Sequence, residues 1–67
     1  MKPGDLVRLV PGYQIYDSLV VRHIRDDLFI LLEEFDPDLE DSSTIFHASG
    51  MKVPVFLGEV ELVQTCK

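Results

Sequence analysis

Turn-forming residues recur along this chain and leave only short runs between them, and this feature constrains its fold most. Turn signals stand at Pro3, Pro11-Gly12, Ser49-Gly50 and Gly58. Short runs rich in Val, Ile and Leu between such signals are typical of β-strands. The chain is therefore predicted to form an all-β domain.

Six short segments are expected to form strands: residues 4–10, 18–25, 28–35, 45–48, 53–57 and 59–63. In the second segment, strand alternation puts Leu19, Val21 and His23 on one face. Pro54 cannot donate a ladder hydrogen bond, so it indicates an edge position or a bulge in the fifth segment. Five or six short antiparallel strands fit a single closed or nearly closed sheet, and closure removes exposed strand edges.

Residues 28–35 are compatible with two structures. Apolar side chains at helical spacing, with an acidic pair just before them, suit a short helix. Pro37 limits that helix to about nine residues. The continuous apolar run from Leu28 to Leu32 also fits a fully buried central strand, with Asp26-Asp27 as the hairpin connection. We predict the strand, and the short helix stays the alternative.

The charge of the chain is concentrated in one segment. The net charge is −6, and residues 26–41 contribute −8 because they hold acidic residues and no Lys or Arg, whereas the rest carries +2. Residues 36–44 are predicted to be an acidic loop inserted between strands. An acidic pole repels phosphate, so nucleic-acid binding is not favoured. It would steer the protein towards a basic protein surface instead.

The size of the chain allows one domain, residues 1–67. So small a domain buries only about 60% of the surface of its unfolded chain and usually needs disulfides, a metal or an oligomer to stabilise it. Cys66 is the only cysteine, which excludes an internal disulfide. Apolar residues make up 46% of the chain, more than its interior can hold, so we expect exposed apolar surface and a docking interface.

No secretory or membrane segment is expected. The start of the chain has no apolar run behind a basic residue, as a signal peptide would. The run from Leu28 to Leu32 is far too short to span a bilayer. The expected location is therefore the interior of a cell.

No catalytic residue is predicted. Nucleophile-elbow and phosphate-loop motifs do not occur in the chain, and its glycines are scattered at turns. His23 and His47 could act as general bases, or as metal ligands with Cys66, but a general base needs a positioned partner and a concave pocket. We interpret both histidines as partly buried or rim residues and expect no enzyme activity and no cofactor.

The acidic loop suggests a calcium site only in part. Asp36, Asp38 and Glu40 fall at the first, third and fifth places of an EF-hand-like loop. The sixth place needs Gly and is Asp41, and the twelfth needs Glu and is His47. No metal ligand is therefore predicted, and the loop is interpreted as solvated or facing a partner.

The two ends of the chain resemble small SH3-like barrels. Residues 2–9 read KPGDLVRL and residues 58–63 read GEVELV, and in many such barrels a PGDLVR-type first strand pairs with an ExELV-type last strand. The chain is similar in particular to short SH3-like proteins of tailed bacteriophages. It departs from them in the acidic insertion at 36–44 and in having no Trp. The loop at 13–17 lacks the basic residue usual in nucleic-acid-binding relatives.

The predicted fold is thus a small SH3-like barrel of five to six short antiparallel strands with one acidic loop insertion. The predicted function is a non-enzymatic structural or protein-interaction module, located in the cytoplasm or incorporated in a phage particle as a minor virion component. It would dock on a larger protein, or on itself, through apolar surface and the acidic loop. Two alternatives stay open, namely a nucleic-acid-associated SH3-like regulator and a small metal-binding protein using the acidic loop.

Eight residues are expected to contact a partner: Tyr13, Tyr16, Arg22, Arg25, Asp36, Asp38, Glu40 and Asp41. One arrangement packs copies head to tail, with the acidic loop of one copy on a basic side of the next. Arg22 and Arg25, with Arg8 and Lys2, would form that basic side. Such heterologous contacts generate rings or filaments.

Overall fold

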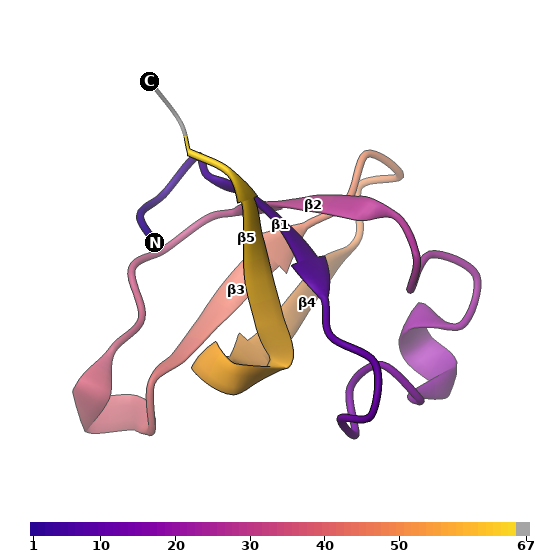
Figure 1. The fold of residues 1–67 in the computed structure, drawn as a ribbon, viewed down its shortest axis with the longest axis horizontal. Helices are drawn as coiled ribbons and strands as arrows, with labels where there is room; N and C mark the ends of the chain where they lie inside the picture. The colour runs from indigo at the N-terminus through magenta and orange to yellow at the C-terminus, as the bar shows by residue number, and fades with distance from the viewer. Residues whose placement is uncertain (66–67) are drawn as a thin grey trace.

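The computed structural model describes residues 1–65 and contains one five-stranded antiparallel sheet (Figure 1). The strands are β1 (Leu6–Leu9), β2 (Leu28–Leu31), β3 (Ser42–Phe46), β4 (Lys52–Phe56) and β5 (Val60–Gln64). Single-turn 3-10 helices lie in the connections, at η1 (Leu19–Val21), η2 (Pro37–Leu39) and η3 (Leu57–Glu59). The prediction of an all-β domain is confirmed.

The strand order is β4-β3-β2-β1-β5, so the first and last strands of the chain lie side by side. β1 is antiparallel to both of its neighbours, with a register shift between Leu6 and Val7 on the β5 side. Within residues 1–65 no pairing joins β4 to β5. The sheet is therefore open, with β4 and β5 as its edges, and closure of the ladder is not observed. The edge position that Pro54 predicts for its strand is confirmed.

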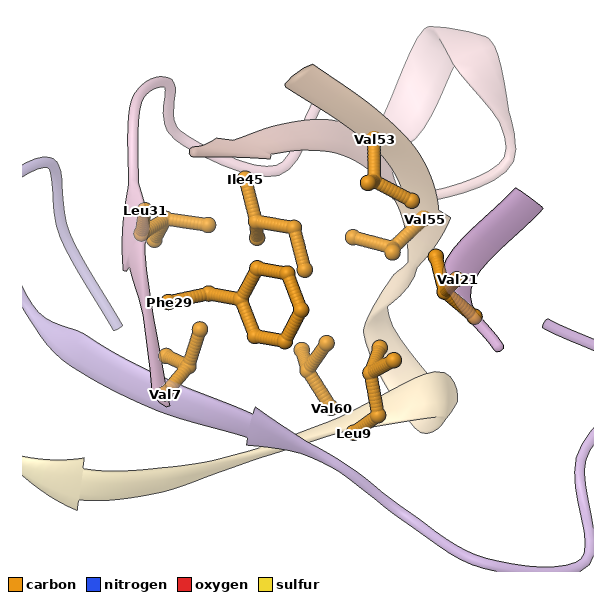
Figure 2. Packing of buried hydrophobic residues seen from close by; sticks show 9 residues of the cluster. All are labelled: Val7, Leu9, Val21, Phe29, Leu31, Ile45, Val53, Val55 and Val60. Atoms are coloured by element: carbon orange, nitrogen blue, oxygen red, sulfur yellow. The ribbon is translucent and has the colours of Figure 1, made fainter. Parts of the chain in front are cut away.

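One hydrophobic core lies inside the curve of the sheet, and every strand contributes to it (Figure 2). Burial alternates with period two along β2 and β4, as one buried sheet face requires. The Phe29 ring lies at the centre of the cluster (Figure 2). The buried apolar residues are Val7, Leu9, Val21, Phe29, Leu31, Ile45, Val53, Val55 and Val60.

The strand predicted at residues 18–25 is wrong. Ser18 caps η1 by accepting a hydrogen bond from the Val20 amide at 3.2 Å, and the following turns are closed by local backbone hydrogen bonds. Only Val21 of this segment is buried, whereas the Leu19 side chain is 81% exposed. Both edges of β1 are already occupied by β2 and β5, so the segment satisfies its backbone within itself. Asp26-Asp27 therefore ends a long loop and is not a hairpin connection.

Residues 28–31 form a strand, which excludes the helix alternative for β2. The strand lies at the middle of the sheet order, as predicted. The prediction that this strand is fully buried is wrong. Only Phe29 and Leu31 face the core, and Leu28 and Ile30 are exposed on the other side. The strand is also shorter than predicted, because residues 32–35 lie beyond its end.

The acidic loop is shorter than predicted, because β3 already begins at Ser42. Asp36 caps η2 by accepting from the Asp38 amide at 2.9 Å. The Asp36 carbonyl accepts from the amides of Leu39 and Asp41 at 3.0 and 2.9 Å. The Asp41 carbonyl accepts from the Leu57 amide at 2.9 Å, which ties the loop to η3. The insertion is therefore a hydrogen-bonded turn of residues 36–41.

Candidate protein-interaction surface

Apolar side chains cover part of the outer side of the sheet. Alternation along β2 turns Leu28 and Ile30 outward, and Leu32 continues the pattern, with 48%, 44% and 38% of each residue exposed. The β-ladder aligns Ile30 with Leu6 on β1 and with Phe46 on β3. Both of these neighbours are half-buried. We call these five residues the outer apolar face.

The outer apolar face is unusual for an antiparallel sheet with one solvated side, where outward positions are normally polar. The β3 strand follows that rule at Ser42 and Thr44 but not at Phe46. β2 does not, since its outward positions are as apolar as its inward ones. Completing the burial of such side chains contributes about 1 kcal/mol each, given about 25 cal/mol per Å² of apolar surface. The face is therefore a surface on which a partner would gain hydrophobic stabilisation.

Acidic residues stand at both ends of this exposed run. Asp26 and Asp27 precede Leu28, Glu33 and Glu34 follow Leu32, and all four are exposed. We call these four carboxylates the acidic rim. Among residues 1–65, neither Glu33 nor Glu34 forms an ion pair.

Basic residues lie beside the face but do not neutralise its rim. Arg8, opposite Leu28 in the β1–β2 ladder, forms an ion pair with Glu61 of β5. Lys52 lies opposite Phe46 at the β4 side. Arg8 and Lys52 thus lie across the strands from β2, whereas acidic residues stand at both of its ends, with Arg25 in the same hollow as Asp26.

Two of the predicted partner residues meet at a hollow beside β1. The Arg25 guanidinium lies 5.0 Å from the centroid of the Tyr16 ring, and the Tyr16 hydroxyl donates to Asp26. This hydrogen bond is the main reason that the pKa of Tyr16 is raised above 10.0. The hollow has a volume of about 230 Å³ and is lined by Arg8, Leu9, Pro11, Tyr16, Arg25, Asp26 and Glu61.

A second hollow, of about 290 Å³, lies between the first loop and the end of β4. Its lining residues are Gln14, Ile15, Ser18, Pro54, Phe56 and Glu59. The Glu59 carboxylate accepts from the Phe56 amide at 2.8 Å and from the Ile15 amide at 3.3 Å. Both of its oxygens thus hold backbone groups, so the carboxylate serves the architecture of this corner.

The eight predicted partner residues do not form one surface. Tyr16 and Arg25 lie together, whereas Arg22 is exposed on the loop after η1. The Tyr13 ring lies beside Gly58, where an added Cβ would be 3.9 Å from it. Asp36, Asp38, Glu40 and Asp41 lie around η2, on the opposite side of the molecule from η1 (Figure 1).

His47 has a defined structural role. Its Nδ1 accepts from the Ser49 amide at 3.0 Å, so Nε2 carries the proton and donates to Asp27 at 2.8 Å. Its ring packs against Phe29 with centroids 5.3 Å apart. The side chain thus ties the β3–β4 turn to the end of the first loop, while His23 is exposed. Within residues 1–65, no three His, Cys, Asp or Glu side chains are grouped to hold a metal ion. Cys66 lies outside the described residues.

Sequence reasoning missed the outer apolar face. The continuous apolar run from Leu28 to Leu32 predicts a strand that is buried on both sides, whereas the core covers one side of β2 only. The signal was present, because a strand that is apolar at every position in an open sheet must expose half of its side chains. The described residues form a single sheet, so no second layer of the fold covers the outward side chains of β2.

Comparison with protein-family models, curated proteins and solved structures finds no match to this chain. In the described part of the chain, no helix has the length and hydropathy required to cross a bilayer.

Proposed function

We propose that this protein is a non-enzymatic interaction module that docks on a larger protein through the outer apolar face. One observation carries the proposal: β2, in the middle of the sheet, exposes Leu28, Ile30 and the following Leu32 on the side away from the core. Contiguous exposed apolar surface marks interaction sites in soluble domains. β2 is apolar at every position, as is typical of a strand buried on both sides, and a partner on this side would complete that burial.

The contacts of the polar side chains support a non-catalytic role. Glu59 and Asp36 accept hydrogen bonds from backbone amides. His47 joins two loops through Asp27 and Ser49. These groups hold turns and loops in place.

For the fold, we propose an SH3-like barrel. The antiparallel pairing of β1 with β5 brings together the two segments on which the sequence resemblance rests, residues 2–9 and 58–63. The curvature of the sheet around one core supports the same assignment (Figure 2). The resemblance to tailed-phage proteins further suggests a minor virion component as the setting, with the larger protein as its neighbour in the particle.

The decisive experiment compares Ile30→Ser with Leu19→Ser in affinity purification from the cells that produce the protein. Leu19 is the more exposed of the two and belongs to η1, not to the strands that form the outer apolar face. We expect the wild type and Leu19→Ser to retain the same partner, and Ile30→Ser to bind it about tenfold more weakly by calorimetry. Thermal unfolding of both variants verifies that they fold. Equal binding by Ile30→Ser and the wild type would show the proposal to be wrong.

A further inference from the structure

We infer that the occupant of the outer apolar face is an amphipathic helical segment of a partner, with an apolar stripe and a Lys or Arg cluster at each end. This inference rests on the proposed function and specifies the partner. It follows from how charge and apolar surface are arranged along one strand.

The order of side chains along β2 carries the inference. Exposed carboxylates come first, at Asp26 and Asp27, then three exposed apolar side chains at alternate positions, then Glu33 and Glu34. A ligand that covers the apolar centre therefore brings its two ends over negative charge. Electrostatic complementarity at an interface fixes orientation and selects among partners.

The rim carboxylates are available to a ligand. Glu33 and Glu34 are exposed and, within residues 1–65, are not engaged by a basic side chain. One oxygen of Asp26 accepts a hydrogen bond from the Tyr16 hydroxyl, and one oxygen of Asp27 accepts a hydrogen bond from His47 Nε2. Each of these two carboxylates can still accept at its second oxygen.

The length of the exposed run sets the size of the ligand. Leu28 and Leu32 are four residues apart on an extended chain, which spans about 13 Å. A helix covers that distance with about nine residues at about 1.5 Å each. With basic residues added at each end, the segment is about 14 residues long.

A second copy of this chain is a poorer occupant. Two copies packed face to face through β2 bring acidic rim against acidic rim, and each copy carries a net charge of −6. Like charges placed opposite one another disfavour association. Lys52 is opposite Phe46 at the β4 side, whereas the repulsion arises at the ends of β2.

The test uses three synthetic helical peptides of this length, titrated into the full chain by calorimetry at low and high salt. One has a Leu stripe with Lys at both ends, one has the same stripe with Glu at both ends, and one has Lys ends with a Ser stripe. We expect measurable binding of the Lys–Leu–Lys peptide only, weakened by salt. Failure of this peptide to bind at millimolar concentration, or equal binding of the Glu-ended peptide, would overturn the inference.

Two variants with the same change of charge locate the effect. Glu33→Gln/Glu34→Gln neutralises half of the acidic rim, and we expect it to weaken binding of the Lys–Leu–Lys peptide about fivefold. Asp38→Asn/Glu40→Gln removes two charges from the η2 turn and should leave affinity unchanged. Equal weakening by both variants would show that net charge alone attracts the peptide, which overturns recognition by the rim.

Failure of the inference can be told apart from failure of the proposed function. If Ile30→Ser abolishes a concentration-dependent dimer seen by sedimentation, and no peptide competes with that dimer, the occupant is a second copy and the inference is wrong while the docking face stands. If Ile30→Ser changes neither peptide binding nor association, the outer apolar face is not a docking surface and both are wrong.

Discussion

Glu40 and Asp41 are held in an unusual backbone conformation. Their φ angles are 58° and 55°, in the left-handed region. An L-residue with a side chain pays about 1–2 kcal/mol there, although Asp tolerates it better than Glu. The hydrogen bonds of Asp41 to Asp36 and to Leu57 keep the turn in this shape. The strain marks a tight return of the chain from η2 into β3.

Replacing Glu40 with Gly is expected to stabilise the protein. Relief of the left-handed strain, about 1–2 kcal/mol, exceeds the added entropy of the unfolded chain, about 0.4–1 kcal/mol. The free energy of unfolding should therefore rise by about 0.5 kcal/mol, measured by urea denaturation. Asp38→Gly is the control, because Asp38 is not among the residues with positive φ, and it should destabilise. A loss of stability in Glu40→Gly would contradict the assignment of strain.

Tyr16 links its ionisation to stability. Its pKa is raised mainly by the hydrogen bond to Asp26 and then by partial burial, with a smaller contribution from Asp17. The folded state thus holds the phenol proton more tightly than the unfolded chain does. This contribution to stability is complete below pH 10.0 and is lost as the pH rises through the folded-state pKa.

Asp26→Asn is expected to lower the pKa of Tyr16 in the folded protein. Asp17→Asn should lower it by less, because Asp17 acts only through its charge and is the smallest of the causes. Ultraviolet-monitored titration of phenolate absorbance measures both shifts. An unchanged Tyr16 titration in Asp26→Asn would mean that the hydrogen bond does not form in solution.

Strand β4 shows how an open sheet edge is protected. The hydrogen bonds from His47 to Met51 and from Leu57 to Asp41 set the alternation of the β3–β4 ladder. By that alternation the amide positions of Lys52, Pro54 and Phe56 point away from β3. Pro54 has no N–H, and the Phe56 N–H is taken by Glu59. The edge therefore offers few donors to another strand, which limits edge-to-edge aggregation.

Glu59→Ala should destabilise the fold and expose this edge. The variant loses two hydrogen bonds to backbone amides, and we expect a loss of about 1–2 kcal/mol in the free energy of unfolding. Glu59→Gln retains one acceptor oxygen and should lose about half as much. Thermal denaturation measures both, and light scattering on heating follows aggregation. If Glu59→Ala and Glu59→Gln both leave the free energy of unfolding almost unchanged, the carboxylate does not stabilise this corner.

At the level of elements, the sequence predicted a strand best where local pattern and neighbours agree. The segments that became β1 and β4 have turn residues on both sides, the segment that became β5 follows Gly58, and all three pair in the sheet. Residues 18–25 have the same alternation but pair with no strand, and local turns satisfy their backbone groups instead. Alternation reports which side chains share a face and says nothing about whether a partner strand is free.

The molecule as a whole depends on a small core. Phe29 is fully buried at its centre (Figure 2). Truncating a buried Phe to Ala costs about 3–5 kcal/mol, whereas a chain of this size has about 3–10 kcal/mol of stability in total. Phe29→Ala should therefore be largely unfolded in solution, as judged by collapse of amide dispersion in an NMR spectrum. Phe29→Leu fills most of the space and should remain folded, and a well-dispersed Phe29→Ala spectrum would contradict the central role of the ring.

By itself, the sequence determined the all-β class and the edge position of Pro54, because turn residues and proline act locally. It also determined the surplus of apolar residues, which is a matter of composition. Only the tertiary structure decided where that surplus lies. The predicted interface residues are scattered because Tyr16, Arg22 and the η2 turn belong to loops on different sides of one sheet. The outer apolar face emerged instead, since register aligns Leu6, Ile30 and Phe46 across three strands. Hydrophobic pattern and turn geometry set the register between two strands, but which strands become neighbours is decided only when the whole sheet forms.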